Sequence, residues 1–197
     1  AGGTIGPVPT LFYEYDKNDR RRDVTCVPYR WNGGKQELEN IQKWYCGKYR
    51  YEWMNEVVSG NDCGIKPIVM RYADVLLMAA EAANELGGAH TREAVGYVNE
   101  VLFRARNASN EQRAEPADWD AGLSQEEIRA ALRVERRCEL KGELHEWFDS
   151  RRFGVAYLTG LIDIHNARIA ETASLSPYDY VLPNGFNEVK KNLLLPF

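Results

Sequence analysis

The sequence predicts a mainly α-helical protein, and three observations support this fold class. Apolar residues recur every three or four positions in two neighbouring segments between residues 67 and 106. Farther along, Ser124 is followed three residues later by Glu127, the pattern of a capping box at the start of a helix. The first third of the chain, by contrast, is rich in glycine and aromatic residues without a clear period. We therefore expect packed helices accompanied by long irregular loops.

The chain has 197 residues, which is enough for one domain with a substantial core. We expect a single domain over residues 1–197, divided into four consecutive parts. These are a loop-rich aromatic segment (1–66), a helical hairpin (67–106), a long helix (123–154) and a tail (155–197) whose first part, Val155–Ile164, is helical.

Two helices joined by a short connection are predicted in the hairpin. The first is expected from about Ile68 to Leu86, after Pro67, and Gly87-Gly88 should end it. The second is expected to begin near Thr91 and carries apolar residues at helical spacing: Ala94, Val95, Val98, Val101, Leu102 and Ala105. Because few residues separate them, the two helices should run antiparallel.

The long helix carries an unusual arrangement of charge. Its apolar stripe consists of Ile128, Ala131, Leu132, Val134 and Cys138, and two glutamates, Glu135 and Glu139, fall inside that stripe. A buried carboxylate without a partner is costly, so each should meet an arginine or several backbone donors. After Gly142 we expect the apolar face to move round to Leu140, Leu144, Trp147 and Phe148.

Arginines at the ends of the hairpin helices are the candidate partners. We predict that Arg71 and Arg104, with Arg106 as a further candidate, form structural ion pairs with Glu135, Glu139 or Glu143. The guanidinium fork can bind a carboxylate bidentately, which suits a packed interface better than lysine does.

Composition excludes several classes of function. A net charge of −4 disfavours nucleic acid as a partner, because phosphate binding requires a clustered basic face. No apolar run approaches the length of a membrane span, and Ala1 does not begin a signal peptide.

The cysteines lack a Cys-x-x-Cys spacing, so we expect neither a metal nor a cofactor. A disulfide among Cys26, Cys46 and Cys63 would need surroundings outside the cytoplasm, and the spacing leaves the pairing open.

Catalytic patterns are scarce. The three histidines lie far apart, and no nucleophile elbow or phosphate-binding glycine loop is present. Glu135, Glu139 and Glu143 recur one helical turn apart, with side chains roughly 6 Å apart, close to the separation of a retaining glycosidase pair. The surrounding apolar stripe and neighbouring arginines disfavour that interpretation, and we expect no catalytic residues.

Several motifs together resemble a known family. They include Glu135-Arg136-Arg137-x-Glu139-Leu140, Trp147-Phe148-Asp149-x-Arg151-Arg152-x-Gly154, Arg71-Tyr72-Ala73-Asp74 and, near the end, Leu182-Pro183 followed by Glu188-Val189. These residues resemble the C-terminal signature of the SusD/RagB family. The chain departs from the family pattern at Glu146, where arginine is usual, and at Ser150, where leucine is usual.

The resemblance implies a SusD-like α superhelix built from hairpins of tetratricopeptide type. It also implies a non-catalytic lipoprotein on the surface of the outer membrane of Bacteroidetes. Such a protein binds oligosaccharides or peptides and passes them to a SusC-like, TonB-dependent transporter. Family members are longer, so the resemblance implies that this chain is the C-terminal part, with the remaining N-terminal portion as its partner and the lipid anchor in a region absent here.

Ligand binding in the family uses loops that precede the Arg71-Tyr72-Ala73-Asp74 segment. In this chain we select Tyr29 with Trp31, and then Tyr51 with Trp53, as candidate ligand-binding residues, because aromatic rings can stack on the apolar face of a sugar. Two alternatives remain open: a helical-repeat scaffold that binds a protein partner, and a glycoside hydrolase.

Overall fold

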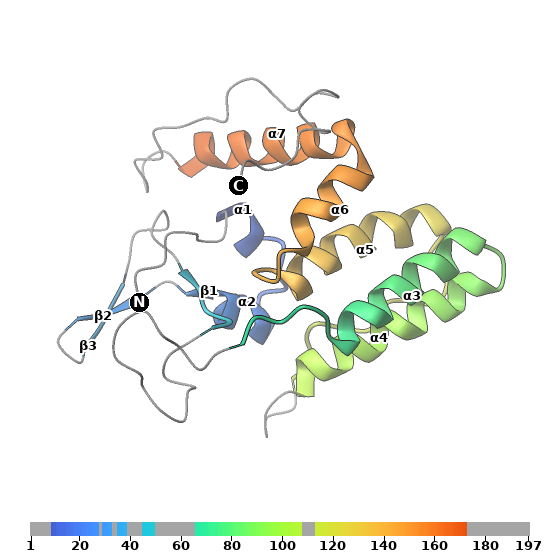
Figure 1. The fold of residues 1–197 in the computed structure, drawn as a ribbon, viewed down its shortest axis with the longest axis horizontal. Coiled ribbons are helices and arrows are strands. Elements are labelled where there is room, and N and C mark those ends of the chain that lie inside the picture. Colours follow the sequence, from blue (N-terminus) through green and yellow to red (C-terminus); the bar gives the residue numbers. More distant parts are fainter. Residues whose placement is uncertain are drawn as a thin grey trace.

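The computed structural model describes residues 9–27, 29–32, 35–38, 45–49, 66–107 and 113–172. This part of the chain is mainly helical, as predicted. Its core is a group of three helices, with smaller elements on one side of that group (Figure 1). Among the described residues, no helix combines the length and the apolar character needed to cross a membrane.

The helical hairpin is confirmed. Helix α3 (Tyr72–Leu86) and helix α4 (His90–Asn107) lie side by side and run in opposite directions (Figure 1). Gly87 ends α3 with a φ of 70°, a left-handed value that a side chain would make costly. Helix α3 begins four residues later than the predicted start at Ile68, and residues 66–71 are not helical. Arg71 is therefore the residue before the helix, and its side chain donates to Glu143.

The continuous helix expected over 123–154 is instead two helices, α5 (Gln125–Leu140) and α6 (His145–Phe153). The chain turns between them at Gly142 and Leu144, which have φ values of 82° and 67°. The turn ends the helical periodicity of α5. The prediction of a buried apolar face that includes Leu144 and Phe148 was therefore wrong, since these side chains are 82% and 66% exposed. The predicted capping box is confirmed, with Ser124 and Glu127 bonded reciprocally.

Helix α7 spans Val155–Thr172 and is longer than the helix expected at the start of the tail. The N-terminal elements are short: α1 (Pro9–Phe12), α2 (Arg20–Thr25), β1 (Cys26–Val27), β2 (Tyr29–Asn32), β3 (Lys35–Leu38) and β4 (Tyr45–Cys46). Strand β1 pairs antiparallel with β4, and β2 pairs antiparallel with β3.

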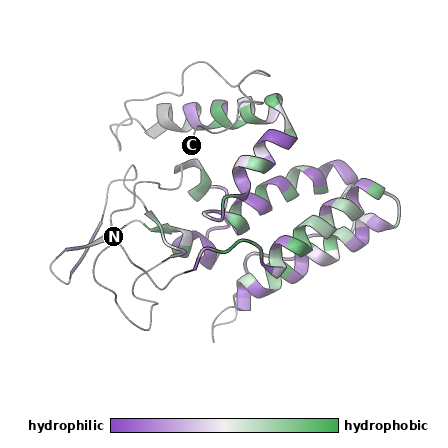
Figure 2. Cartoon of the chain, viewed as in Figure 1, coloured by the Kyte–Doolittle hydropathy of each residue, from purple (hydrophilic) through white to green (hydrophobic). Residues whose placement is uncertain are grey.

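The main hydrophobic core lies where α3, α4 and α5 meet. It contains the predicted apolar positions of the hairpin together with residues of α3 and α5: Leu76, Leu77, Ala80, Ala83, Ala94, Val95, Val98, Val101, Leu102, Ile128, Leu132 and Leu140. A second, smaller cluster joins the N-terminal segment to α5 through Leu11, Tyr15, Cys26 and Cys138. Figure 2 shows that α5 is nevertheless hydrophilic along most of its length. The buried face of α5 must therefore hold many charged side chains.

Candidate functional site

Charged residues of α5 and of the turn after it converge with cations from four other parts of the chain. We call this group the charge cluster, and it consists of Asp19, Arg21, Lys48, Arg71, Arg104, Glu135, Glu139 and Glu143. The cations come from α2, from the segment after β4, from the residue before α3 and from the end of α4. The cluster thus connects elements that are distant in sequence.

Glu139 is at the centre of the charge cluster. Its side chain is 2% exposed and accepts hydrogen bonds from Arg71 and Arg104 through one oxygen, and from Arg21 at 2.8 Å through the other. Burial by itself would raise the pKa of Glu139, but the charges of Arg104, Arg21 and Arg71 hold that pKa below its usual value. Glu139 is therefore a buried carboxylate that remains ionised.

Glu143 occupies the next turn and is also held by cations. Arg71 donates from Nε at 2.6 Å, and Lys48 donates from Nζ at 2.5 Å. Burial opposes ionisation, yet these two hydrogen bonds lower the pKa of Glu143, while burial lowers the pKa of Lys48. Arg71 thus bridges Glu139 and Glu143, which fixes the turn after α5 against the start of α3.

Glu135 has fewer partners. Among the described residues its side-chain partner is Arg21, which also binds Asp19 at 2.7 Å and Glu139 at 2.8 Å. Burial raises the pKa of Glu135 to about 7, and the charge of Arg21 offsets this only in part. Because burial outweighs the charge of a guanidinium that Glu135 shares with Asp19 and Glu139, Glu135 keeps its proton to a higher pH than a solvent-exposed glutamate does.

Glu135→Gln should remove a pH-dependent loss of stability. Between pH 4.5 and about 7 the folded protein keeps a proton on Glu135 that the unfolded chain releases, so the free energy of unfolding falls as pH rises through this window. The loss should be on the order of 2 kcal/mol. Urea denaturation of both proteins at several pH values from 5 to 8 measures it.

The exposed Glu126 provides the control, because Glu126→Gln should leave the pH profile of the parent unchanged. Identical profiles for the parent and Glu135→Gln would contradict the assignment.

The structure places the sequence-predicted charged residues as follows. Arg71 and Arg104 both contact Glu139, and Arg71 also contacts Glu143. Arg106 does not reach these glutamates; it donates to the Pro116 carbonyl and to Asp118 at 2.6 Å each.

Two cations were missed in the sequence, Arg21 and Lys48. The only sequence signal for Arg21 is an Asp-Arg-Arg run after Tyr13-x-Tyr15, and Lys48 has no local signal.

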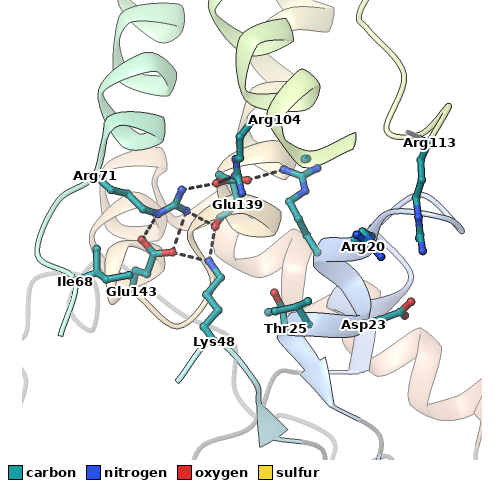
Figure 3. Close-up of a pocket in the computed structure, with 13 residues that line it drawn as sticks. Arg20, Asp23, Thr25, Lys48, Ile68, Arg71, Arg104, Arg113, Glu139 and Glu143 are labelled. Carbon is teal, nitrogen blue, oxygen red and sulfur yellow. Dashed lines mark hydrogen bonds and ion pairs between the residues drawn. The ribbon is translucent and has the colours of Figure 1, made fainter. Parts of the chain in front are cut away.

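A cavity of about 750 Å³ opens beside the charge cluster (Figure 3). Six of its lining residues are cationic and three are acidic, so its wall has an excess of hydrogen-bond donors and positive charge. Arg71 and Lys48 point toward Glu143, whereas Arg20 and Arg113 lie on the opposite side. The lining residues are Arg20, Arg21, Asp23, Val24, Thr25, Lys48, Ile68, Arg71, Arg104, Ala105, Arg113, Glu139 and Glu143.

The three glutamates do not share one cavity. Glu139 and Glu143 line the cavity of about 750 Å³, whereas Glu135 lines a second one of about 290 Å³ with Tyr15 and Asp19. Each carboxylate is also occupied by guanidinium or ammonium donors. This arrangement is unlike a glycosidase pair, in which two acids face one substrate. Within the described ranges, no group of three His, Cys, Asp or Glu side chains could hold a metal ion.

The candidate ligand-binding residues are placed only in part. Tyr29 and Trp31 belong to β2, where Tyr29 is paired with Leu38 and Trp31 with Gln36 of β3. Since successive strand residues alternate between faces, positions 29 and 31 share one face of this hairpin. Tyr51 and Trp53 lie outside the described residues.

Comparison with known proteins identifies the family. The model of the SusD family matches residues 10–196, nearly the whole chain. The chain belongs to the SusD family. Among curated proteins it is similar to SusD-like protein P2 of Formosa agariphila, with 43% identity over 158 residues, which cover 74% of this chain and 30% of that protein. SusD-like protein P25 of the same organism is 36% identical over 129 residues, covering 65% of this chain and 23% of that protein. The chain thus matches less than a third of the length of either relative.

Proposed function

We propose that the protein binds oligosaccharides, or other nutrient oligomers, at the cell surface without catalysis and delivers them to a TonB-dependent outer-membrane transporter. The observation that carries this proposal is membership of the SusD family over residues 10–196. A lipid anchor in the outer membrane and a SusC-like transporter as partner belong to the same proposal.

In this proposal the helices α3, α4 and α5 form the support, and the β2–β3 hairpin carries the binding surface. The charge cluster fixes α3, α4 and α5 to the N-terminal segment, which gives a rigid support. Positions 29 and 31 of β2 are both paired with β3, and two positions at this separation are roughly 7 Å apart along a strand. Two aromatic residues at this spacing can stack on one saccharide, with specificity supplied by nearby hydrogen-bond donors. Tyr51 and Trp53 are proposed as further members of this surface.

A second candidate function is a helical scaffold that binds protein, and one observation favours it. Helix α3 exposes apolar side chains three residues apart over its first turns, beginning with Tyr72 at 66%, and exposes Leu86 at its end at 73%. Val75 and Met78 are exposed on the same helix. Repeat hairpins usually bury such a face against a neighbour. The N-terminal portion of a longer SusD-like protein is our proposed occupant, which makes this contact compatible with nutrient binding.

Trp31→Ala should reduce the affinity for a bound oligosaccharide at least tenfold, about 1.4 kcal/mol, because a stacking surface is lost. A glycan array identifies a ligand for the parent, and isothermal titration then compares the variants. Phe103→Ala is the control, since Phe103 is an exposed aromatic residue on α4.

Unchanged affinity in Trp31→Ala would discard this residue as a binding site. A parent that binds no glycan or peptide would discard the proposed function, and cleavage of the oligosaccharide during the assay would favour the hydrolase alternative.

A further inference from the structure

Two cysteines face each other across the short sheet formed by β1 and β4. Cys26 is the register partner of Cys46 in this antiparallel pair. The N–H of Gly47 donates to the carbonyl of Thr25 at 3.1 Å, so the hydrogen bond joins the residues that flank the cysteine pair. Cys26 and Cys46 therefore occupy a non-hydrogen-bonded site, at which the two side chains leave the sheet on the same face.

The geometry of such a site fits a disulfide. Directly opposed residues at a non-hydrogen-bonded site have Cα atoms about 4.5 Å apart, within the range of about 4.4–6.8 Å found for disulfide-linked cysteines. Both thiols are free in the structure.

The surroundings leave room for sulfur at this position. Cys26 is fully buried in the cluster with Leu11 and Tyr15, and Cys46 is half-buried. A Cβ atom at Gly142 would lie 2.6 Å from the Cys46 Sγ, so the glycine is what allows the turn after α5 to pack on this sulfur. Of the two cysteines, Cys46 is the less buried.

We propose that Cys26 and Cys46 form a disulfide bond that covalently joins β1 to β4. The two thiols lose two protons and two electrons as the S–S bond forms. The oxidant is a second disulfide, carried by a thiol–disulfide oxidoreductase outside the cytoplasm, and it is reduced to two thiols. Cys46, the less buried of the two, attacks it first as a thiolate, and Cys26 then displaces the oxidant from the mixed disulfide.

Once formed, this disulfide should resist reduction in the folded protein. A reducing thiolate can approach the half-buried Cys46 sulfur more readily than the buried Cys26 sulfur, which makes the Cys26 thiolate the leaving group. Burial raises the pKa of the Cys26 thiol to about 12, and thiols of high pKa leave slowly.

The proposed bond also bears on the cavity beside the charge cluster. Strand β1 continues from α2, which carries Arg21, and Lys48 follows β4 by two residues. Thr25 and Lys48 both line that cavity. A Cys26–Cys46 bond would therefore lock together the two N-terminal segments that supply cations to Glu139 and Glu143.

The test oxidises the purified chain with oxidised glutathione and maps its cysteines by peptide mass analysis without reduction. We expect an intact mass about 2 Da below that of the reduced chain, since two hydrogens are lost, and a linked peptide pair containing Cys26 and Cys46. Link formation through Cys63 or Cys138, or full alkylation of all cysteines in the oxidised sample, would overturn the proposal.

A stability comparison distinguishes the bond from simple packing. The oxidised parent should melt roughly 6–12 °C above the reduced parent, because the closed loop limits the unfolded chain. In Cys46→Ala this difference between oxidising and reducing conditions should vanish. An equal loss of melting temperature for Cys46→Ala under both conditions would show that Cys46 contributes packing only and would contradict the proposal.

Discussion

Glu139→Ala should lower the free energy of unfolding by about 3 kcal/mol, because it removes a buried anion that the mostly buried Arg21 and Arg71 share. Arg21, Arg71 and Arg104 all direct a guanidinium nitrogen at this carboxylate. Arg21 would keep Asp19 and Glu135, and Arg71 would keep Glu143. Arg104 would lose its ion pair with Glu139, but its side chain is 51% exposed, so water takes the place of the carboxylate there. Denaturation in urea, with the m value checked against the parent, measures the loss.

Two further variants make this result specific. Glu126→Ala changes a glutamate of the same helix whose side chain is 82% exposed, and it should have little effect on stability. Glu139→Gln keeps the shape and one acceptor oxygen, so its loss should fall between those of the two alanine variants. If Glu139→Ala unfolded at the same urea concentration as the parent, the charge cluster would not stabilise the fold.

From the sequence, the charge cluster could be predicted only in part, starting from the glutamates of α5. Glutamates inside an apolar stripe require partners, and this argument correctly directs attention to arginines near the helix ends, of which Arg71 and Arg104 contact Glu139. Arg21 is 118 residues away from Glu139 in the chain. No periodicity or spacing signal reaches over such a separation, because the approach of α2 to α5 depends on tertiary packing.

The element boundaries illustrate the same limit. Gly87 ends α3 as expected, since a glycine after an apolar helix is a local signal. The break after Leu140 was missed although Gly142 lies there, because Leu144 continues the apolar spacing and yet adopts a left-handed conformation. The tight approach of Gly142 to the sulfur of Cys46 is again a tertiary contact. Local sequence rules therefore predict that a segment is helical more reliably than they predict where that helix is interrupted.

The charges of α5 bind several neighbouring parts of the chain. Glu135 and Glu139 bind Arg21 of the N-terminal segment. Arg137 binds Glu14 and the hydroxyl of Tyr157 in α7, which extends the contact to the C-terminal helix. We infer that these paired charges specify one orientation of the elements, which hydrophobic burial by itself does not select. This accounts for a core helix that is hydrophilic over most of its length.

Arg136 of α5 tests whether buried charge pairs fix the neighbouring helices, because it binds both α3 and α6. It is 4% exposed and donates to Asp74 of α3 at 3.1 Å and to Asp149 of α6 at 2.7 Å. Arg136→Ala should therefore destabilise by about 3–5 kcal/mol, because it leaves buried carboxylates on two helices. Asp149 retains a hydrogen bond from Arg152 at 2.9 Å, so most of the cost should come from Asp74. Arg129→Ala, on the exposed side of α5, is the matched control and should change stability little.

A triple variant separates charge from shape. Replacing Arg136 by Met together with Asp74→Leu and Asp149→Leu removes the ions and keeps similar volume, so it should recover most of the stability lost in Arg136→Ala. The same triple variant should melt over a broader temperature range, because apolar side chains no longer fix the orientation of α6 against α3. If the triple variant were as unstable as Arg136→Ala, lost packing rather than unpaired charge would be the cause. If it were stable and melted as sharply as the parent, the ion pairs would not be needed to specify this arrangement of helices.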